Sequence, residues 1–228
     1  MQPNRFNVPK NIMAKGLLCL IAAGVIFFAG QFLAQFSATQ PYSMKNQAIS
    51  DLGITSCGPY TEYATHKAVS VCVPLHLVMS GTFVAYGALI MLGVSLALRF
   101  LWPQGRFRKS GLVLMFFGGI EAVVSGFSPI NLAPVLHSIS GGLAIFALNI
   151  SLILLGVAAK KEWKWLGRLT IFAGVIGVFG SLMDGQPPYA ALGYGGWERV
   201  AGYVFALWVI VVGLYLRSKL NKNQPLPQ

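Results

Sequence analysis

The sequence predicts an all-α integral membrane protein, a bundle of six transmembrane helices with both termini in the cytoplasm. Hydrophobic residues make up 55% of the 228 residues and charged residues 10%, and the mean hydropathy is +0.65, values typical of a polytopic membrane protein. A hydrocarbon core about 30 Å thick requires roughly 20 mostly apolar residues per helix. Six runs approach that length, at residues 16–36, 74–98, 111–129, 134–158, 169–183 and 200–216.

The basic residues predict the orientation of the bundle, because Lys and Arg resist translocation and stay on the cytoplasmic side. Of 17 basic residues, all but Lys45, Lys67 and Arg199 fall in the two tails or in the second and fourth loops. We therefore expect cytoplasmic tails at 1–15 and 217–228, and a transmembrane domain at 16–216 whose outer loop, 37–73, forms a cap. The predicted location is the inner membrane of a prokaryote, with any site facing the periplasm or exterior. The net charge of +11 then reflects topology and contact with the bilayer, and the scattered basic residues argue against a nucleic-acid partner.

Two of the three cysteines, Cys57 and Cys72, fall in this outer loop, whereas Cys19 falls in the first helix. We expect a disulfide between Cys57 and Cys72, which an oxidising compartment permits. Closing a loop of this size contributes roughly 3 kcal/mol on the chain-entropy model. A metal site at the two thiols is the alternative, but it lacks the close ligand spacing that such sites usually have.

Polar side chains gather at the predicted outer ends of the helices and in the loops between them. Three helices begin at this side, and their positive dipole ends favour an anion there and disfavour imidazolium. Neutral histidines in such a place are candidate bases or metal ligands. The candidate catalytic residues are Asp51, His76, His137, Asp184 and Glu198; the candidate ligand-binding residues are Ser50, Ser80, Asn131 and Arg199, with Glu121 deeper in the bundle.

Three of these residues recur at equal spacing: His76, His137 and Glu198 are each 61 positions apart. The spacing is consistent with three helical hairpins of similar length, each returning through a helix headed by a polar residue. Six helices joined by similar loops also give near-regular spacing by chance.

Glu121 lies in the middle of the third apolar run. A charged residue at the bilayer centre costs on the order of 3 kcal/mol, so the carboxyl should face a partner or a wet cavity. It is either a proton carrier or a protonated acid that bonds a neighbouring helix. Gly118, Ala122 and Gly126 form a ladder of small residues that permits close helix packing and favours an interior position.

The chain resembles domain-of-unknown-function family 998, prokaryotic membrane proteins with about six helices. The resemblance rests on the stretch 42–53 with its Ser50-Asp51-Leu52-Gly53 run, on His137 after a Pro/Asn loop, and on Asp184 followed by Glu198-Arg199 and Trp208. It covers nearly the whole chain, and the run at 50–53 is its most specific part. The resemblance implies the fold and the membrane location but no activity.

Three functional hypotheses remain open from the sequence. The first is a hydrolase in which His76, His137 and Asp51, or another outer acid, hold a zinc ion that activates water beside a lipid or lipid-linked substrate. A similar Ser/His/Asp pattern occurs in the alkaline-ceramidase-like and adiponectin-receptor-like superfamily, but the late His-x-x-x-His pair and the seventh helix of that superfamily are missing here. Histidines that only cap loop carbonyls are the simpler alternative.

The second hypothesis is a transporter or sensor of a small anionic or lipid-derived ligand, with Glu121 as the proton carrier. Inverted repeats and discontinuous helices, the usual signs of a transporter site at the midplane, are not evident in the sequence. The third is a structural or assembly subunit whose polar outer cap binds another protein. No soluble domain accompanies the six runs, which fits this hypothesis as well.

Overall fold

The computed structural model describes residues 8–61, 68–184 and 191–222, and six of its helices are long and apolar enough to cross a membrane. Arg5 and Lys67, together with the outermost parts of both predicted tails, lie outside the described residues. The helices are α1 (Lys10–Ser37), α2 (His76–Gly93), α4 (Arg108–Phe127), α5 (Pro134–Ala159), α6 (Lys164–Asp184) and α7 (Gly193–Asn221). A π-helical turn η2 (Val94–Leu98) and a short helix α3 (Arg99–Leu101) extend α2 at its far end.

Each apolar run predicted from the sequence corresponds to one of these helices, which confirms the six-helix fold. The largest differences are at the ends: α1 begins six residues earlier than the run at 16–36, and α7 begins seven residues earlier than the run at 200–216. A helix continues as long as its backbone hydrogen bonds can form, so polar turns such as Lys10–Lys15 remain helical beyond the apolar segment. A search for apolar runs finds only the part of a helix that lies within the hydrocarbon core of the bilayer.

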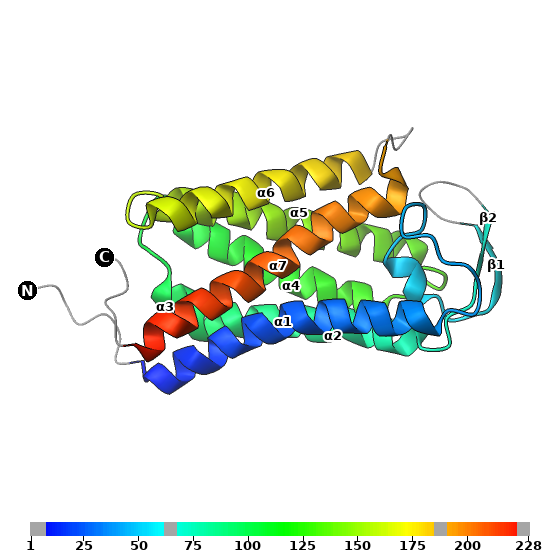
Figure 1. The fold of residues 1–228 in the computed structure, drawn as a ribbon, viewed down its shortest axis with the longest axis horizontal. Helices are drawn as coiled ribbons and strands as arrows, with labels where there is room; N and C mark the ends of the chain where they lie inside the picture. The colour runs from blue at the N-terminus through cyan, green and yellow to red at the C-terminus, as the bar shows by residue number, and fades with distance from the viewer. Residues whose placement is uncertain (1–7, 62–67, 185–190, 223–228) are drawn as a thin grey trace, which may run out of the picture.

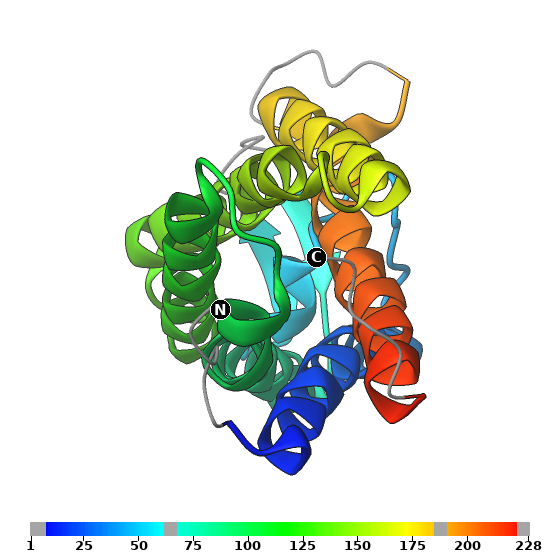
Figure 2. The same cartoon turned by 90° about the vertical axis from the view of Figure 1, so that its left-hand side faces the viewer.

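The six helices form a closed ring in which neighbours along the chain are neighbours in space. Helix α1 packs against α2, α2 against α4, and so on to α7, which returns to pack against α1 (Figure 2). Helix α5 also contacts α7, so that α6 lies outside the centre of the ring. The start of α1 and the end of α7 lie at the same end of the bundle (Figure 1).

Small residues allow the helices of this ring to approach closely. A Cβ atom added to Gly87 of α2 would overlap with the carbonyl of Gly119 on α4, and one added to Gly118 would lie 2.7 Å from the Leu148 side chain on α5. Gly118, Ala122 and Gly126 are all buried, which confirms that this ladder faces the interior.

The segment between α1 and α2 covers one end of the bundle, and we refer to residues 38–75 as the cap (Figure 1). It contains a 3-10 turn η1 (Ser50–Gly53) and an antiparallel hairpin of β1 (Gly58–Thr61) and β2 (Ala68–Val71), paired from Gly58 with Val71 to Thr61 with Ala68. Cys57 and Cys72 form the predicted disulfide at the base of this hairpin. All four residues of η1 are buried, so the turn plugs the end of the ring.

Candidate functional site

A cavity of about 70 Å³ lies inside the ring, beneath the cap. Its walls come from α1, α2, α4, α5 and α7, and η1 closes it from the cap side. Since a cavity needs roughly 10–15 Å³ to hold one water molecule, this one has room for several waters or for part of a small organic molecule. Most lining residues are apolar; the polar ones are Ser50, Tyr86, Ser125, His137, Asn149 and Glu198.

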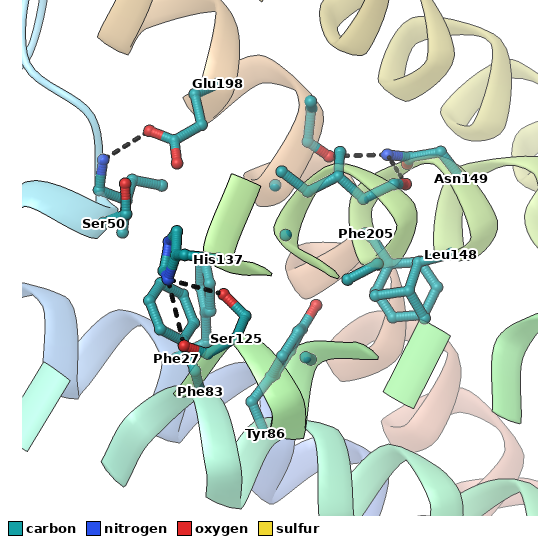
Figure 3. A pocket seen from close by; sticks show the side chains of 17 residues that line it. Phe27, Ser50, Phe83, Tyr86, Ser125, His137, Leu148, Asn149, Glu198 and Phe205 are labelled. Carbon is teal, nitrogen blue, oxygen red and sulfur yellow. Dashed lines mark hydrogen bonds between the residues drawn. The ribbon is translucent and has the colours of Figure 1, made fainter. Parts of the chain in front are cut away.

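The polar groups are unevenly placed around the cavity. Figure 3 shows Ser50, Glu198 and His137 together on one side and Asn149, Leu148 and Phe205 on the other. The first group belongs to the cap, to the first turn of α5 and to the second turn of α7, whereas the second lies deeper in the bundle. The cavity therefore has a polar end beneath the cap and an apolar body within the membrane-spanning part.

His137 reaches the cavity from the first turn of α5, and it is 6% exposed. Its Nδ1 lies 2.7 Å from the Ser128 carbonyl oxygen and 3.2 Å from that of Ser125. Two carbonyl acceptors at one nitrogen fix the tautomer with the proton on Nδ1. The Nε2 lone pair is then available as a base or hydrogen-bond acceptor in the cavity.

Glu198 connects the cavity to the cap. One carboxylate oxygen accepts a hydrogen bond of 2.5 Å from the backbone N–H of Ile49, directly before Ser50. Ser50 and Ile49 also line the cavity, so this bond sets the position of the plug relative to α7. Glu198 thus contributes both a carboxyl group at the polar end and an anchor for η1.

Arg199 holds the cap from the neighbouring position on α7, although the sequence suggested that it binds a ligand. Its Nη1 donates to the carbonyls of Met44, Gln47 and Gly195 at 2.7–2.9 Å, and its Nη2 donates to the Tyr42 hydroxyl at 2.5 Å. Burial raises the pKa of the Tyr42 phenol above its ordinary value, opposed by the nearby Arg199 charge. The protonated hydroxyl donates in turn to the Ala48 carbonyl at 2.6 Å.

The other predicted site residues lie near this end of the bundle but do not line the cavity. Asp51 is fully buried within η1 and accepts a hydrogen bond from the Ala48 N–H at 3.0 Å. Asn131 bonds the cap through the backbone N–H and hydroxyl of Thr55. Ser80 lies next to Gly53, where an added Cβ would be 3.4 Å from its hydroxyl oxygen.

His76, Asp184 and Glu121 also lie away from the cavity. His76 begins α2, where its Nδ1 is 3.1 Å from the Val73 carbonyl oxygen, as expected for a histidine that caps a loop carbonyl. Asp184 is the last residue of α6, the helix outside the centre of the ring. Glu121 is partly exposed on α4.

The predicted zinc ligands do not form a fitting set. Across the parts of the chain that the structure describes, no three side chains of His, Cys, Asp or Glu lie close enough together to hold a metal ion. His137 lines the cavity, but His76 and Asp51 are each engaged in the cap and its junction with α2. These three side chains therefore do not fit the zinc site that the sequence suggested.

Three polar lining residues were not among the sequence candidates: Tyr86, Ser125 and Asn149. The Asn149 amide nitrogen donates to the carbonyls of Ile145 and Ala201, both at 3.0 Å, and thereby joins α5 to α7. Its Oδ1 is buried without a hydrogen-bond partner among the described residues. Asn149 could have been predicted as a site residue, because its amide is a polar group within an apolar helix. Tyr86 and Ser125 could not, because whether their side chains point into the cavity depends on the rotation of α2 and α4 about their axes.

No curated protein and no solved structure matches the chain. A family model does match residues 21–215, which include α2, α4, α5 and α6, most of α1 and α7, and the cap. Its description is a protein of unknown function, DUF998. The match covers well over half of the chain, and so the protein belongs to the DUF998 family of proteins of unknown function.

Proposed function

We propose that this membrane protein binds a small amphipathic, lipid-derived molecule in the cavity beneath the cap. One observation carries the proposal: an apolar cavity among five helices has its charged and basic groups, Glu198 and His137, at a single end. Ligand pockets are mostly apolar, with a few polar groups that fix orientation. The head group would lie beside Ser50, His137 and Glu198, and the apolar part would lie along Phe27, Leu148 and Phe205.

The cap end faces the periplasm or exterior in this proposal, in the inner membrane of a prokaryote. The support is the charge distribution: the described basic residues fall at the opposite end, except Lys45 in the cap and Arg199, which is bound to the cap. Basic loops stay on the cytoplasmic side. The ligand would then reach the cavity from the outer leaflet or from outside the cell.

The proposal is tested by filling the cavity. Gly141 lines it, and an added Cβ there would make only an ordinary contact, 3.5 Å from the Ser125 hydroxyl oxygen. Gly141→Leu should therefore fold and occupy the space. The adjacent Gly142, whose added Cβ would meet no described atom within 4 Å, gives a matched control, Gly142→Leu.

The measurement is photolabelling of the protein in nanodiscs with a diazirine derivative of hexanol, with adducts located by mass spectrometry. We expect adducts on cavity residues of α5 and α7 in the wild type and in Gly142→Leu, and their loss in Gly141→Leu. Equal labelling of all three proteins, or labelling confined to lipid-facing residues, would exclude the cavity as a binding site.

Hydrolysis of a bound ester is a second candidate function, favoured by the His137 tautomer. With the proton on Nδ1 held by Ser128, Nε2 can accept a proton from a water molecule that attacks the ester carbonyl carbon. The same proton then passes to the departing alkoxide as the carbon–oxygen bond breaks, giving an acid and an alcohol. This step uses water and the chain's own residues.

The test is the release of nitrophenol from 4-nitrophenyl hexanoate. General bases contribute about 100-fold or more to rate, so His137→Gln should lower the rate by that factor, while His76→Gln, which changes a histidine outside the cavity, should not. An equal rate in the wild type and in His137→Gln would exclude the proposed hydrolysis by His137 and would leave the binding proposal unaffected.

A further inference from the structure

Tyr86 is a polar residue of the cavity wall whose hydroxyl the protein itself does not use. The residue lies on α2, lines the cavity and is only 5% exposed. Among the residues that the structure describes, no group forms a hydrogen bond with its hydroxyl. Figure 3 shows the phenol oxygen pointing from α2 into the cavity, between its polar end and its deeper side.

Aromatic contacts hold the ring of Tyr86 and give its hydroxyl a defined position. The ring centroid lies 4.9 Å from that of Phe27 on α1 and 6.5 Å from that of Phe205 on α7. Aromatic pairs at such separations attract one another. Both partner rings also line the cavity, so the polar atom of Tyr86 is presented from an apolar aromatic cluster.

A buried hydroxyl without a partner is unfavourable, and a bound molecule that accepts a hydrogen bond from it removes that penalty. A single water molecule is a poor substitute at this position. Buried water typically makes about three hydrogen bonds, and the rings in contact with Tyr86 offer none. The apolar body of the cavity therefore favours an organic ligand that carries an acceptor at this depth.

We infer that the cavity recognises a ligand with a carbonyl oxygen in its chain, as in an ester or a ketone, and that Tyr86 donates a hydrogen bond to that oxygen. The inference rests on the proposed function and specifies its ligand class. A carbonyl accepts through its lone pairs and has no hydrogen to donate, so it satisfies the phenol without adding a donor. A ligand hydroxyl at the same depth would add an O–H that needs its own acceptor among apolar side chains.

The polar end of the cavity suits the other end of such a ligand. With its proton on Nδ1, His137 accepts a hydrogen bond at Nε2, and the Ser50 hydroxyl can donate or accept. A hydroxyl head group supplies the donor that Nε2 needs. The ligand class is thus a hydroxylated molecule with a carbonyl group further along its apolar chain.

The experiment measures how well three alcohols with the same eight-carbon chain displace the hexanol diazirine probe from the cavity in nanodiscs. The compound 1-octanol has no carbonyl, whereas 1-hydroxyoctan-3-one and 1-hydroxyoctan-6-one carry a ketone oxygen at two depths. Ketones are chosen because hydrolysis does not consume them. Each ketone is compared with 1-octanol in the wild type and in Tyr86→Phe, since the ratio between the two proteins cancels differences in partitioning into lipid.

We expect at least one ketone to displace the probe about fivefold better, relative to 1-octanol, in the wild type than in Tyr86→Phe. That factor is what one neutral hydrogen bond contributes. Tyr86→Phe keeps the ring and its aromatic contacts, so it should fold. Tyr215→Phe, which removes a phenol hydroxyl from a part of α7 outside the cavity, should retain the wild-type ratio.

The outcomes separate this inference from the proposed function. Equal ratios in the wild type and in Tyr86→Phe for both ketones overturn carbonyl recognition and leave ligand binding intact. No cavity adduct with the hexanol probe in the wild type overturns both.

A second measurement does not depend on the folding of Tyr86→Phe. The infrared stretch of a ¹³C-labelled ketone carbonyl should move to lower frequency in wild-type nanodiscs compared with Gly141→Leu nanodiscs, because Tyr86 donates to it only in an open cavity. Identical bands in the two samples would also overturn carbonyl recognition.

An intact lipid and a soluble lipid fragment can both carry an ester carbonyl. Nanodiscs of ester-linked and ether-linked phosphatidylcholine distinguish these sources, because only the ester-linked lipid has carbonyl groups that compete with the probe. Weaker labelling of the wild type in the ester-linked nanodiscs, without such a difference in Tyr86→Phe, assigns the carbonyl to a lipid of the bilayer. Equal labelling in both nanodiscs, together with the preference for a ketone, assigns it to a soluble fragment.

Discussion

Adjacent residues on α7 carry opposite charges and have different tasks. Glu198 lines the cavity and bonds η1 through the Ile49 N–H, whereas Arg199 bonds three carbonyls and the Tyr42 hydroxyl. Two glycines of the same turn, Gly193 and Gly195, let the cap backbone approach: an added Cβ at Gly195 would overlap with the Gln47 carbonyl, and Gly193 has a φ of +73°. The first two turns of α7 therefore position the cap over the cavity.

Arg199→Lys should destabilise the protein, because an ammonium cannot reach the Tyr42 hydroxyl and all three carbonyls at once. Hydrogen bonds to charged groups contribute about 1.5–3 kcal/mol each, and losing more than one of them should lower the free energy of unfolding by about 3 kcal/mol. Denaturant titration in detergent measures the change. Arg106→Lys, at an exposed position in the opposite loop, is the matched control and should leave stability unchanged.

The helices and the cap depend on close packing and on one covalent link. Helices α2 and α4 cross where Gly87 faces Gly119, and the cap hairpin is closed by Cys57 and Cys72. Neither feature involves the cavity residues directly. Both nevertheless hold in place the helices and the cap that carry His137 and Glu198.

Gly87→Ala should separate α2 from α4, since its Cβ would overlap with the Gly119 carbonyl. Overpacking of this kind costs about 1–3 kcal/mol. On the same helix, an added Cβ at Gly81 would meet no described atom within 4 Å, so Gly81→Ala should be neutral or slightly stabilising. Thermal unfolding of both variants in one detergent tests the difference; equal midpoints would contradict this account of the crossing.

Removal of the disulfide by Cys57→Ser and Cys72→Ser should cost about 3 kcal/mol, as expected for a sequence separation of 15 residues. The effect should appear in denaturant unfolding under non-reducing conditions and vanish when wild type and variant are compared in reductant. Cys19→Ser, which changes a thiol outside the cap, is the control.

At the scale of the whole molecule, the sequence was sufficient for the six-helix fold and for the disulfide. The number of helices could be predicted because each long apolar run, bounded by polar loops, forms one helix. The disulfide that closes the hairpin could be predicted because Cys57 and Cys72 fall in the same outer loop. The sequence also brought Ser50, His137 and Glu198 into the candidate site, and all three line the cavity.

The sequence alone could not show which of the remaining candidate residues line the cavity, because that depends on the rotation of each helix about its axis. His76 and His137 both stand near the start of a helix, yet only His137 points into the ring. Arg199 and Asn131 carry polar groups at the same end, but cap carbonyls and Thr55 occupy them. Asn149 and Tyr86 were missed: the amide of Asn149 in an apolar helix was a signal that the prediction did not use, and the side on which Tyr86 lies depends on the rotation of α2.

The predicted orientation of the bundle can be tested with a membrane-impermeant maleimide on intact cells. Leu132 is 68% exposed in the loop between α4 and α5, and Trp165 is 66% exposed at the start of α6, at the other end. In a Cys19→Ser background, Leu132→Cys should be labelled from outside and Trp165→Cys only after the cells are permeabilised. The reverse pattern would place the cap in the cytoplasm.

The attachment of the cap restricts how the cavity can be reached from that side. The chain joins the cap only to the end of α1 and the start of α2, where the Thr39 N–H also donates to the Cys72 carbonyl at 3.0 Å and the Leu75 N–H to the Ser37 hydroxyl at 3.2 Å. Contacts with Asn131, Glu198 and Arg199 are reversible. The covalent attachment of the cap therefore lies at α1 and α2, and its attachments beside the cavity, at Glu198 and Arg199, are noncovalent.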